Sequence, residues 1–456
     1  MFPRLKVFYF LRNHFQTMSP LLPRERKTFV LHMSYSFLEG IIAGLIILNE
    51  FVFVKSLLGS SYQLALLFQF SMAVFLLLIF MNEWLKRIRK KRNVLRKAAL
   101  LTRLPLLLLF FFPRSPESLG GDSIYHYIFL GIFLVYYLGN TIIWPTINLF
   151  LKTTYRHENF SRLFSYATTL NKIVMMVTTF VYGWLLDMDN FIFVYIFPIA
   201  AVLGVLSVFL LSMIPYQPAD VEVKNNGLWN SVRDSALGMV KILKTNRSFF
   251  DFQVGFMLYG MGFMGSVTVI VLFFESGLGL NYSSIAFYKN GYNLLAIILL
   301  PFFGKLMGKI DPRRFTAMSF FAMLLYILFL TLTEYFPAYT EFWDIRLHYM
   351  LIFYILFHGV FAATMALTWF IGSAYFCSPE EAGNYQSVHL VLTALRSLFA
   401  PLMGVALYEA FGFTVTFSIA MSFLALGISY LLWSERNVPL PGGAKPGKKQ
   451  EGKVVS

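Results

Sequence analysis

Long apolar stretches recur along the whole chain and are separated by short polar or charged segments. A helix that crosses a bilayer needs about 20 mostly apolar residues, because only the helix itself can satisfy its backbone hydrogen bonds there. The third stretch is short and contains Arg103 and Pro105. The pattern predicts an all-α integral membrane protein with twelve transmembrane helices, at 28–52, 61–84, 98–113, 124–150, 163–186, 191–214, 248–274, 283–304, 315–337, 347–373, 384–408 and 413–434.

The longest polar interruption runs from Gln217 to Phe249 and divides the predicted spans into six and six. The two halves have similar spacing, and Tyr182–Leu186 weakly matches Met403–Leu407. Two halves related by an axis along the membrane normal, with the substrate between them, are a recurring transporter design. The predicted organisation is a cytoplasmic tail, a six-helix bundle, a cytoplasmic linker, a second pseudo-symmetric six-helix bundle and a basic disordered tail, at 1–27, 28–214, 215–247, 248–434 and 435–456.

The composition excludes a water-soluble multidomain protein. Hydrophobic residues make up 57% of the chain and charged residues 13%, whereas soluble domains average about 25% charged residues. The single cysteine, Cys377, excludes a disulfide framework, a thiolate zinc site and an iron–sulfur cluster. The sequence lacks a G-x-x-x-x-G-K-[ST] loop, H-E-x-x-H and G-x-S-x-G, so we expect neither an ATP-driven pump nor an enzyme, and no cofactor or metal.

The positive charges predict the orientation. Of the 38 Lys and Arg residues, 32 fall in segments on one side of the predicted spans and only Lys55, Arg114 and Arg346 on the other. Positive loops stay in the cytoplasm, so both termini are expected inside a multi-pass protein of the cell membrane. Contact with anionic lipids then explains the net charge of +15 without nucleic acid. Residues 2–15 are expected to form an interfacial amphipathic segment or, alternatively, a solvated tail.

The loop after the eighth span, from Gly304 to Arg314, carries a family resemblance. It resembles the inter-helix loop G-x-L-x-D-[RK]-x-G-R-[RK] of the major facilitator superfamily, with matches at Gly304, Leu306, Lys309 and Arg313 and departures at Gly308, Asp311 and Pro312. The first-half counterpart, from Asn82 to Arg92, keeps only the basic character. The twelve spans, the six-plus-six division and Ala400-Pro-Leu-Met-Gly404 agree with the resemblance.

In this family the loop acts in gating, and the resemblance implies the same role for Gly304, Lys309, Asp311, Arg313 and Arg314. Basic residues near an acidic partner can pair in one arrangement of the two halves and separate in the other. Because the usual aspartate is missing, Asp311 or Glu83 would have to replace it. The alternative is ordinary cytoplasmic positive charge with a tight Asp-Pro turn.

Glu39 is the main candidate for proton coupling. It lies about eleven residues, or roughly 16 Å, into the first span, which is near mid-depth. A charge at the bilayer centre costs at least about 2.5–3.5 kcal/mol, so such a residue is a functional candidate. It belongs to one helical stripe, formed by His32, Tyr35, Glu39, Ala43, Ile46 and Glu50. The alternative role for Glu39 is a permanent salt bridge with Lys172.

Three cations lie inside predicted spans: Lys172, Lys289 and Arg396. In the resembled family, spans 1, 4, 7 and 10 line the central cavity and spans 2, 5, 8 and 11 flank it, so all three could reach a substrate. Together they favour a solute with an anionic group. Alternatively, Lys289 extends to the membrane surface and Arg396 pairs within its own half. The candidate substrate-binding residues are Lys172, Arg396, Asn140, Tyr259, Lys289, Asn293, His358 and His389. Lone polar residues such as Asn140 and His358 could instead make interhelical hydrogen bonds.

The sequence Gly260-Met-Gly-Phe-Met-Gly265 spells the dinucleotide fingerprint G-x-G-x-x-G. That motif works only between a strand and a helix of a βαβ unit, and here it lies inside an apolar span. Its glycines, like Gly40 and Gly44 in the first span, are expected to permit close helix packing.

These observations predict a secondary active transporter that moves a small polar or anionic solute by alternating access, coupled to protons. Its expected partners are a small-molecule substrate and membrane lipids, and the protein is expected to be a monomer. One alternative is a drug or metabolite efflux antiporter of the same fold, although the fifth span lacks the G-x-x-x-G-P-x-x-G-G motif common in such exporters. The second alternative is a membrane-embedded lipid-processing protein. Such a protein would need a cluster of catalytic carboxylates or histidines, which the sequence does not suggest.

Overall fold

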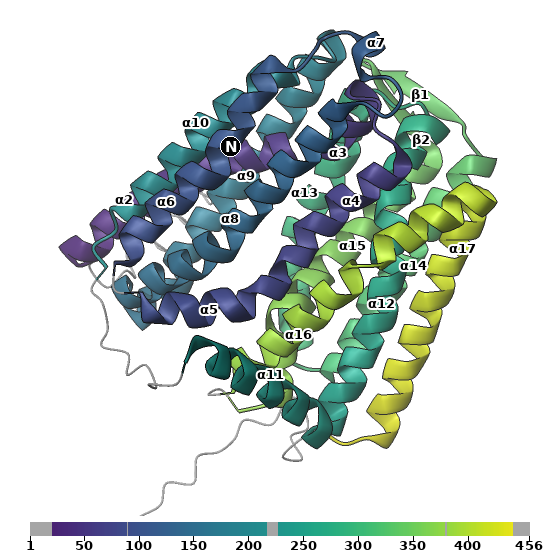
Figure 1. The fold of residues 1–456 in the computed structure, drawn as a ribbon. Coiled ribbons are helices and arrows are strands. Elements are labelled where there is room, and N and C mark those ends of the chain that lie inside the picture. Colours follow the sequence, from purple (N-terminus) through teal and green to yellow (C-terminus); the bar gives the residue numbers. More distant parts are fainter. Residues whose placement is uncertain (1–20, 89, 217–226, 379–380, 441–456) are drawn as a thin grey trace, which may run out of the picture.

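The computed structural model describes residues 21–88, 90–216, 227–378 and 381–440. Within these residues the chain is almost entirely helical, and most of the helices run in roughly the same direction (Figure 1). The predicted amphipathic segment 2–15 lies outside the described residues, as does most of the basic C-terminal tail.

The first half contains the helices that correspond to the first six predicted spans. The first helix continues through two short pieces after a turn at Ile47 and Leu48, and the second changes to a 3-10 helix over Val74–Leu77. The helices are α2 Pro23–Ile46, α3 Asn49–Phe51, a π-helical turn Val52–Ser56, α4 Ser61–Ala73, α5 Leu78–Arg87, α6 Lys91–Arg103, a 3-10 helix Leu104–Phe111, α7 Pro116–Leu119, α8 Ile124–Thr154, α9 His157–Met188 and α10 Phe193–Ser212.

The second half repeats this arrangement after a linker helix that the sequence analysis did not predict. The elements are the linker helix α11 Leu228–Thr245, α12 Arg247–Leu272, a π-helical turn Phe273–Gly277, α13 Tyr282–Met307, α14 Pro312–Tyr335, the strands β1 Tyr339–Phe342 and β2 Ile345–His348, α15 Tyr349–Ile371, a 3-10 helix Gly372–Phe376, α16 Ala382–Ser397 and α17 Ala400–Asn437. Gly412 interrupts α17 with a positive φ of 77°, so α17 holds the end of the eleventh span and all of the twelfth.

In the described part of the chain, nine helical segments are long and apolar enough to cross a membrane. One of them, Ala382–Asn437, contains two predicted spans joined at Gly412. The second predicted span appears as the shorter apolar helix Ser61–Leu77, and the third as α6 with its 3-10 extension. The prediction of an all-α membrane fold is therefore confirmed.

The two halves pack their helices by the same scheme. In the first half α2 contacts α9 and α10, and α8 contacts both α4 and α6. In the second half α12 contacts α16 and α17, and α15 contacts both α13 and α14. In each half, therefore, the first span contacts the fifth and sixth, and the fourth contacts the second and third. This repeated scheme is the pseudo-symmetry that the spacing of the sequence predicted.

Glycines allow the closest helix approaches. A Cβ atom on Gly40 would lie 2.7 Å from the carbonyl oxygen of Asn171, and one on Gly44 would lie 2.6 Å from that of Met175. In the second half, Gly262 faces the carbonyl oxygen of Ala420 at 2.8 Å. The predicted packing role of these glycines is confirmed, because a side chain at any of them would collide with the backbone of the neighbouring helix.

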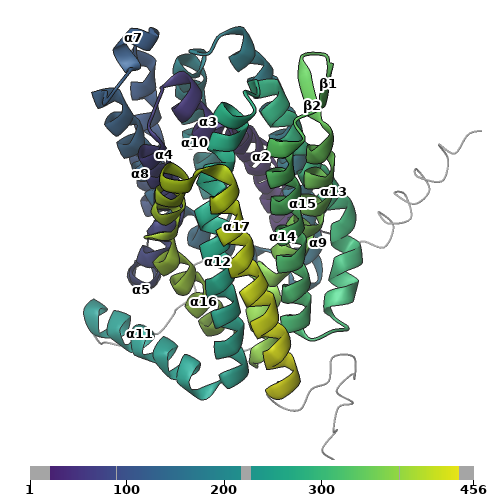
Figure 2. The ribbon, with the colours of Figure 1, turned by 90° about the vertical axis from the view of Figure 1, so that its right-hand side faces the viewer.

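Two features mark the ends of the molecule. The β-hairpin Tyr339–His348 lies at one end, here called the hairpin end, and turns at Trp343 and Asp344, whose φ angles are 51° and 60°. Helix α11 lies at the opposite end, here called the linker end, and runs across the direction of the spans (Figures 1 and 2). Its Ser231 Oγ accepts a hydrogen bond from Arg87 of the first half at 3.0 Å, and Asn246 begins α12 of the second half directly after it.

Candidate functional site

Glu39 lies inside the first half, partly buried on α2. Its Oε1 accepts a hydrogen bond of 2.6 Å from the hydroxyl of Ser207 on α10. Tyr35 and Tyr136 lie within electrostatic range of both Glu39 and Arg103. The acid therefore belongs to a polar cluster contributed by four helices, here called the Glu39 cluster: Tyr35, Glu39, Arg103, Tyr136, Asn140 and Ser207.

Arg103 corrects the sequence analysis, which counted it with the charges of the preceding loop. The structure places it at the end of α6 with only 1% of its surface exposed. Its guanidinium lies 3.8 Å from the ring centroid of Tyr136 and donates a 3.3 Å hydrogen bond to Asn140 Oδ1. Its Nε and Nη1 have no hydrogen-bond partner within the described residues. The Arg103 guanidinium is therefore a buried cation near Glu39 with two nitrogens free to donate hydrogen bonds within the described chain.

Lys172 does not form the salt bridge with Glu39 that the sequence left open. Its side chain on α9 is exposed, and no acidic group of the described chain lies within 4.0 Å of it. The face of α9 that packs on α2 instead carries Asn171, whose side chain donates to the carbonyl oxygen of Ser36 at 3.0 Å. Lys172 and Glu39 therefore form no ion pair among the described residues.

Arg396 is enclosed in the second half between α16 and α12. Only 1% of its surface is exposed, and its Nη1 donates a hydrogen bond to the carbonyl oxygen of Phe256. Its guanidinium lies over the ring of Tyr259 at 5.7 Å, and its side chain fills the space left by Gly260. Two of its nitrogens, Nε and Nη2, have no partner among the described residues. Arg396 and Arg103 thus share a pattern: each is buried over a tyrosine and against a glycine.

His389 lies on the same helix as Arg396, two turns earlier, and its Nδ1 is 3.1 Å from Gln253 Oε1. Its ring packs edge-on against Phe256, at a centroid distance of 4.5 Å, and against Trp369, at 4.7 Å. Gln253 Nε2 and His389 Nε2 are buried without a described partner. The sequence analysis did not single out Gln253. A lone amide side chain in an apolar span could have indicated a polar contact between helices.

Lys289 does not extend to the membrane surface. Its ammonium lies 3.9 Å from Glu50 Oε2 of the first half, and both side chains are mostly buried, with 18% and 19% of their surface exposed. Glu50 belongs to the predicted stripe with Glu39, but its pairing with a residue 239 positions away had no indication in the sequence. This ion pair joins the two halves.

An aromatic cluster lies next to Lys289. The His358 ring stacks between Tyr292, at a centroid distance of 3.7 Å, and Tyr326, at 4.4 Å. Tyr354 meets the His358 ring edge-on at 5.1 Å. Asn293 does not point to a shared site, because its side chain donates to the carbonyl oxygen of Lys289 one helical turn away at 2.7 Å.

The candidate gating loop forms contacts inside the second half. Asp311 begins α14 and pairs with Arg313 at 2.9 Å. Arg313 also donates to the carbonyl oxygens of Ser434 and Val438, and Arg314 pairs with Glu435 at 3.0 Å. Gly304 and Lys309 are exposed. In this arrangement the loop is tied to the end of α17, and a gating role that involves the other half stays a prediction.

The two halves meet closely at the hairpin end. Asp187 at the end of α9 accepts backbone hydrogen bonds of 2.7 Å from both Tyr282 and Ser283, at the start of α13. Ser56 and Tyr282 share a 2.6 Å hydrogen bond, and Lys55 donates to the carbonyl oxygen of Leu280 at 2.8 Å. A carboxylate at a helix N-terminus is favourable because it meets free N–H groups and the positive end of the helix dipole.

Replacing Asp187 with asparagine should therefore weaken closure of the hairpin end. We expect a loss of about 1 kcal/mol, which is roughly a fivefold shift toward the open form. Electron–electron distance measurements between spin labels at Glu117 and Glu341, in a Cys377→Ser background, would detect it; both positions are exposed at the hairpin end. Asp189→Asn is the matched control, since the Asp189 carboxylate accepts a hydrogen bond from Phe191 of its own half. Equal distance distributions in both variants would contradict a sealing role for Asp187.

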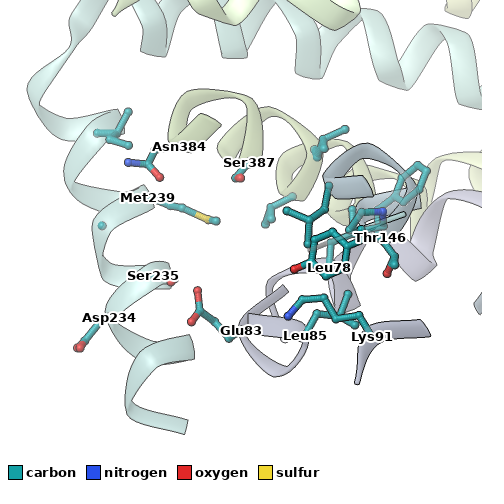
Figure 3. Close-up of a pocket in the computed structure, with 18 residues that line it drawn as sticks. Leu78, Glu83, Leu85, Lys91, Thr146, Asp234, Ser235, Met239, Asn384 and Ser387 are labelled. Carbon is teal, nitrogen blue, oxygen red and sulfur yellow. The ribbon is translucent and has the colours of Figure 1, made fainter. Parts of the chain in front are cut away.

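The linker end instead contains a cavity of about 610 Å³. Its walls come from both halves and from α11, with α5 and α8 on one side and α16 on the other (Figure 3). Glu83, Lys91, Asp234 and Ser235 lie along one edge, and Asn384 and Ser387 lie opposite them (Figure 3). Partial burial lowers the pKa of Lys91 below its ordinary value. The remaining lining is largely apolar, so the cavity is amphiphilic.

Comparisons with known proteins agree with this architecture. The family model of the Major Facilitator Superfamily matches residues 28–347, so the chain belongs to this superfamily of membrane transporters. No curated protein matches it in sequence. The fold is nevertheless similar to solved transporters of low sequence identity.

Three such structures show the extent of the similarity. A variant of the nucleoside transporter NupG superposes with a TM-score of 0.67 at 12% identity, covering 89% of this chain and 99% of that one. A bacterial homolog of the human lysosomal transporter Spinster, in an inward-facing and unoccupied conformation, gives 0.62 at 14% identity, with 91% and 98% covered. A structure of proton dependent oligopeptide transporters gives 0.60 at 12% identity, with 90% and 99% covered. These structures show the shared fold, and membership of the superfamily makes the chain a multi-pass secondary transporter rather than an enzyme.

Proposed function

We propose that this protein moves a small polar solute across the cell membrane by alternating access, with proton coupling. The observation that carries the proposal is the asymmetry between the two ends: contacts between the halves close the hairpin end, while a cavity of about 610 Å³ separates them at the linker end. Closure at one end and opening at the other is what alternating access requires. We place the linker end and both termini in the cytoplasm, on the distribution of positive charge.

Glu39 is the proposed proton carrier. It is held by a single hydroxyl from Ser207 and has no ion-pair partner within 4.0 Å in the described chain. Such a carboxyl group can exchange a proton without first breaking a salt bridge. The structure titled as that of proton dependent oligopeptide transporters shares this fold, which supports proton coupling.

Arg396 is the proposed solute anchor in the second half, supported by its two unpartnered nitrogens. His389, Gln253 and Tyr259 surround it and could supply further hydrogen bonds. Lys172, being exposed and unpaired within the described residues, fits an approach to the site rather than its centre.

Proteoliposomes loaded with a pH-sensitive dye test the proposal. Addition of pooled small polar solutes outside the vesicles should acidify the lumen only when wild-type protein is present and a transported solute is in the pool. Arg396→Ala should lose the response, and Arg396→Lys should keep part of it. Uptake of solutes by wild type without any proton movement would contradict proton coupling.

An efflux antiporter of the same fold is a second candidate, favoured by the apolar lining of the linker-end cavity, which includes Phe75, Leu78 and Leu390. The same vesicles decide between the two. A symporter moves protons and solute in the same direction, whereas an antiporter would make the lumen more alkaline as the solute enters.

A further inference from the structure

An ion pair between Glu50 of the first half and Lys289 of the second joins the two halves. At 3.9 Å the pair is loose, and neither charged group has a hydrogen-bond partner in the described chain. Breaking such a mostly buried pair leaves an uncompensated charge, which is strongly unfavourable. Any movement that separates the halves here therefore requires another anion for Lys289.

The surroundings of Lys289 contain polar and aromatic groups but, among the described residues, no second carboxylate that interacts with its ammonium. The ionisable groups within electrostatic range of the pair are Tyr137 on α8, Tyr292 on α13 itself and His358 on α15. The ammonium also lies 5.7 Å from the ring centroid of Phe51. His358 Nδ1 is buried without a partner in the described chain. In the tautomer that carries a proton on Nδ1, this nitrogen can donate a hydrogen bond to an oxyanion held by Lys289.

We propose that Lys289 is a second anion-binding group of the solute site, besides the Arg396 anchor, and that Glu50 occupies it when the site is empty. The proposal rests on the proposed function, in that it places the solute between the two halves. A proton taken up from the bulk solution neutralises the Glu50 carboxylate, and the carboxylate or phosphate group of the solute then takes its place beside Lys289. Charge is conserved at the site, because the solute anion replaces the Glu50 carboxylate, and the proton on Glu50 enters in addition to the one that Glu39 carries. The solute class is accordingly a small organic anion.

Thermal unfolding of the purified full-length protein, followed by tryptophan fluorescence, tests this exchange without a membrane gradient. The probes are sodium acetate and sodium phosphate, with sodium chloride at equal ionic strength and neutral acetamide as references. In wild type, either anion should raise the unfolding midpoint, with a roughly tenfold tighter apparent Kd at about pH 5 than at about pH 8. Acetate and phosphate arms distinguish a carboxylate solute from a phosphorylated one.

Variants separate exchange from a purely structural ion pair. Glu50→Gln leaves Lys289 permanently available, so it should bind the anions tightly at both pH values. Lys289→Gln should lose the response at both, and Lys289→Arg should keep it, which controls for misfolding. Lys305→Gln on the exposed end of α13 is the matched control and should behave as wild type.

The inference is overturned if Glu50→Gln and Lys289→Gln lower the unfolding midpoint equally while neither alters the anion response. It is also overturned if no anion stabilises wild type or Glu50→Gln at either pH. The dye-based vesicle assay is independent of these measurements. Transport without an anion response would refute only the exchange, whereas an anion response without transport would refute the proposed function.

Discussion

Replacing Glu39 with glutamine is expected to abolish proton-driven solute accumulation, with a loss of at least roughly tenfold that corresponds to about 1.4 kcal/mol of lost coupling. Glutamine keeps the size of the side chain, and its amide oxygen can still accept the hydrogen bond from Ser207. It cannot take up or release a proton. Exchange of solute across the vesicle membrane without a proton gradient should therefore continue, while accumulation driven by the gradient should stop.

The measurement compares gradient-driven uptake with equilibrium exchange in the same proteoliposomes. Glu409→Gln is the matched control, because Glu409 is an exposed carboxylate on α17. If Glu39→Gln accumulates solute as wild type does, with an unchanged pH dependence, Glu39 is not the proton carrier. Loss of both accumulation and exchange would instead assign Glu39 to solute binding.

The largest expected effect on stability comes from Gly404→Ala. A Cβ atom at this position would lie 1.9 Å from the carbonyl oxygen of Gly265 and 2.6 Å from its carbonyl carbon. Both are backbone atoms of α12, so no side-chain rotation can relieve the collision, and α17 must move away. Overpacking of this kind costs about 1–3 kcal/mol and sometimes more. We expect a value at or above the upper end of that range.

Thermal unfolding in detergent would measure this loss. Gly131→Ala on α8 is the matched control, because no atom lies within 4 Å of its added Cβ and alanine is the better helix former. A midpoint for Gly404→Ala equal to that of wild type would show that α12 and α17 are less tightly packed than the structure indicates.

The positions of the spans could be predicted because they depend on local composition. Each apolar stretch must form a helix in the bilayer wherever it lies in the fold, and the twelve predicted stretches correspond to helices here. The glycine contacts followed as well, since small residues in apolar spans favour close packing. Arg103 shows the limit of such reasoning. It lies within the predicted third span but follows a strongly basic loop, so the sequence groups it with the loop charges, whereas in the structure its side chain is buried.

The sequence by itself therefore determined the membrane class, the helical stretches, their division into two halves and the presence of Glu39, Lys289 and Arg396 within them. Only the tertiary structure decided their partners: Ser207 near Arg103 for Glu39, Glu50 for Lys289, and the Phe256 carbonyl for Arg396. The burial of a charged residue can be predicted from local hydropathy, because burial depends on the apolar segment that contains the residue. Pairing depends on the rotation and depth of helices that are distant in sequence, and only the packed bundles fix those.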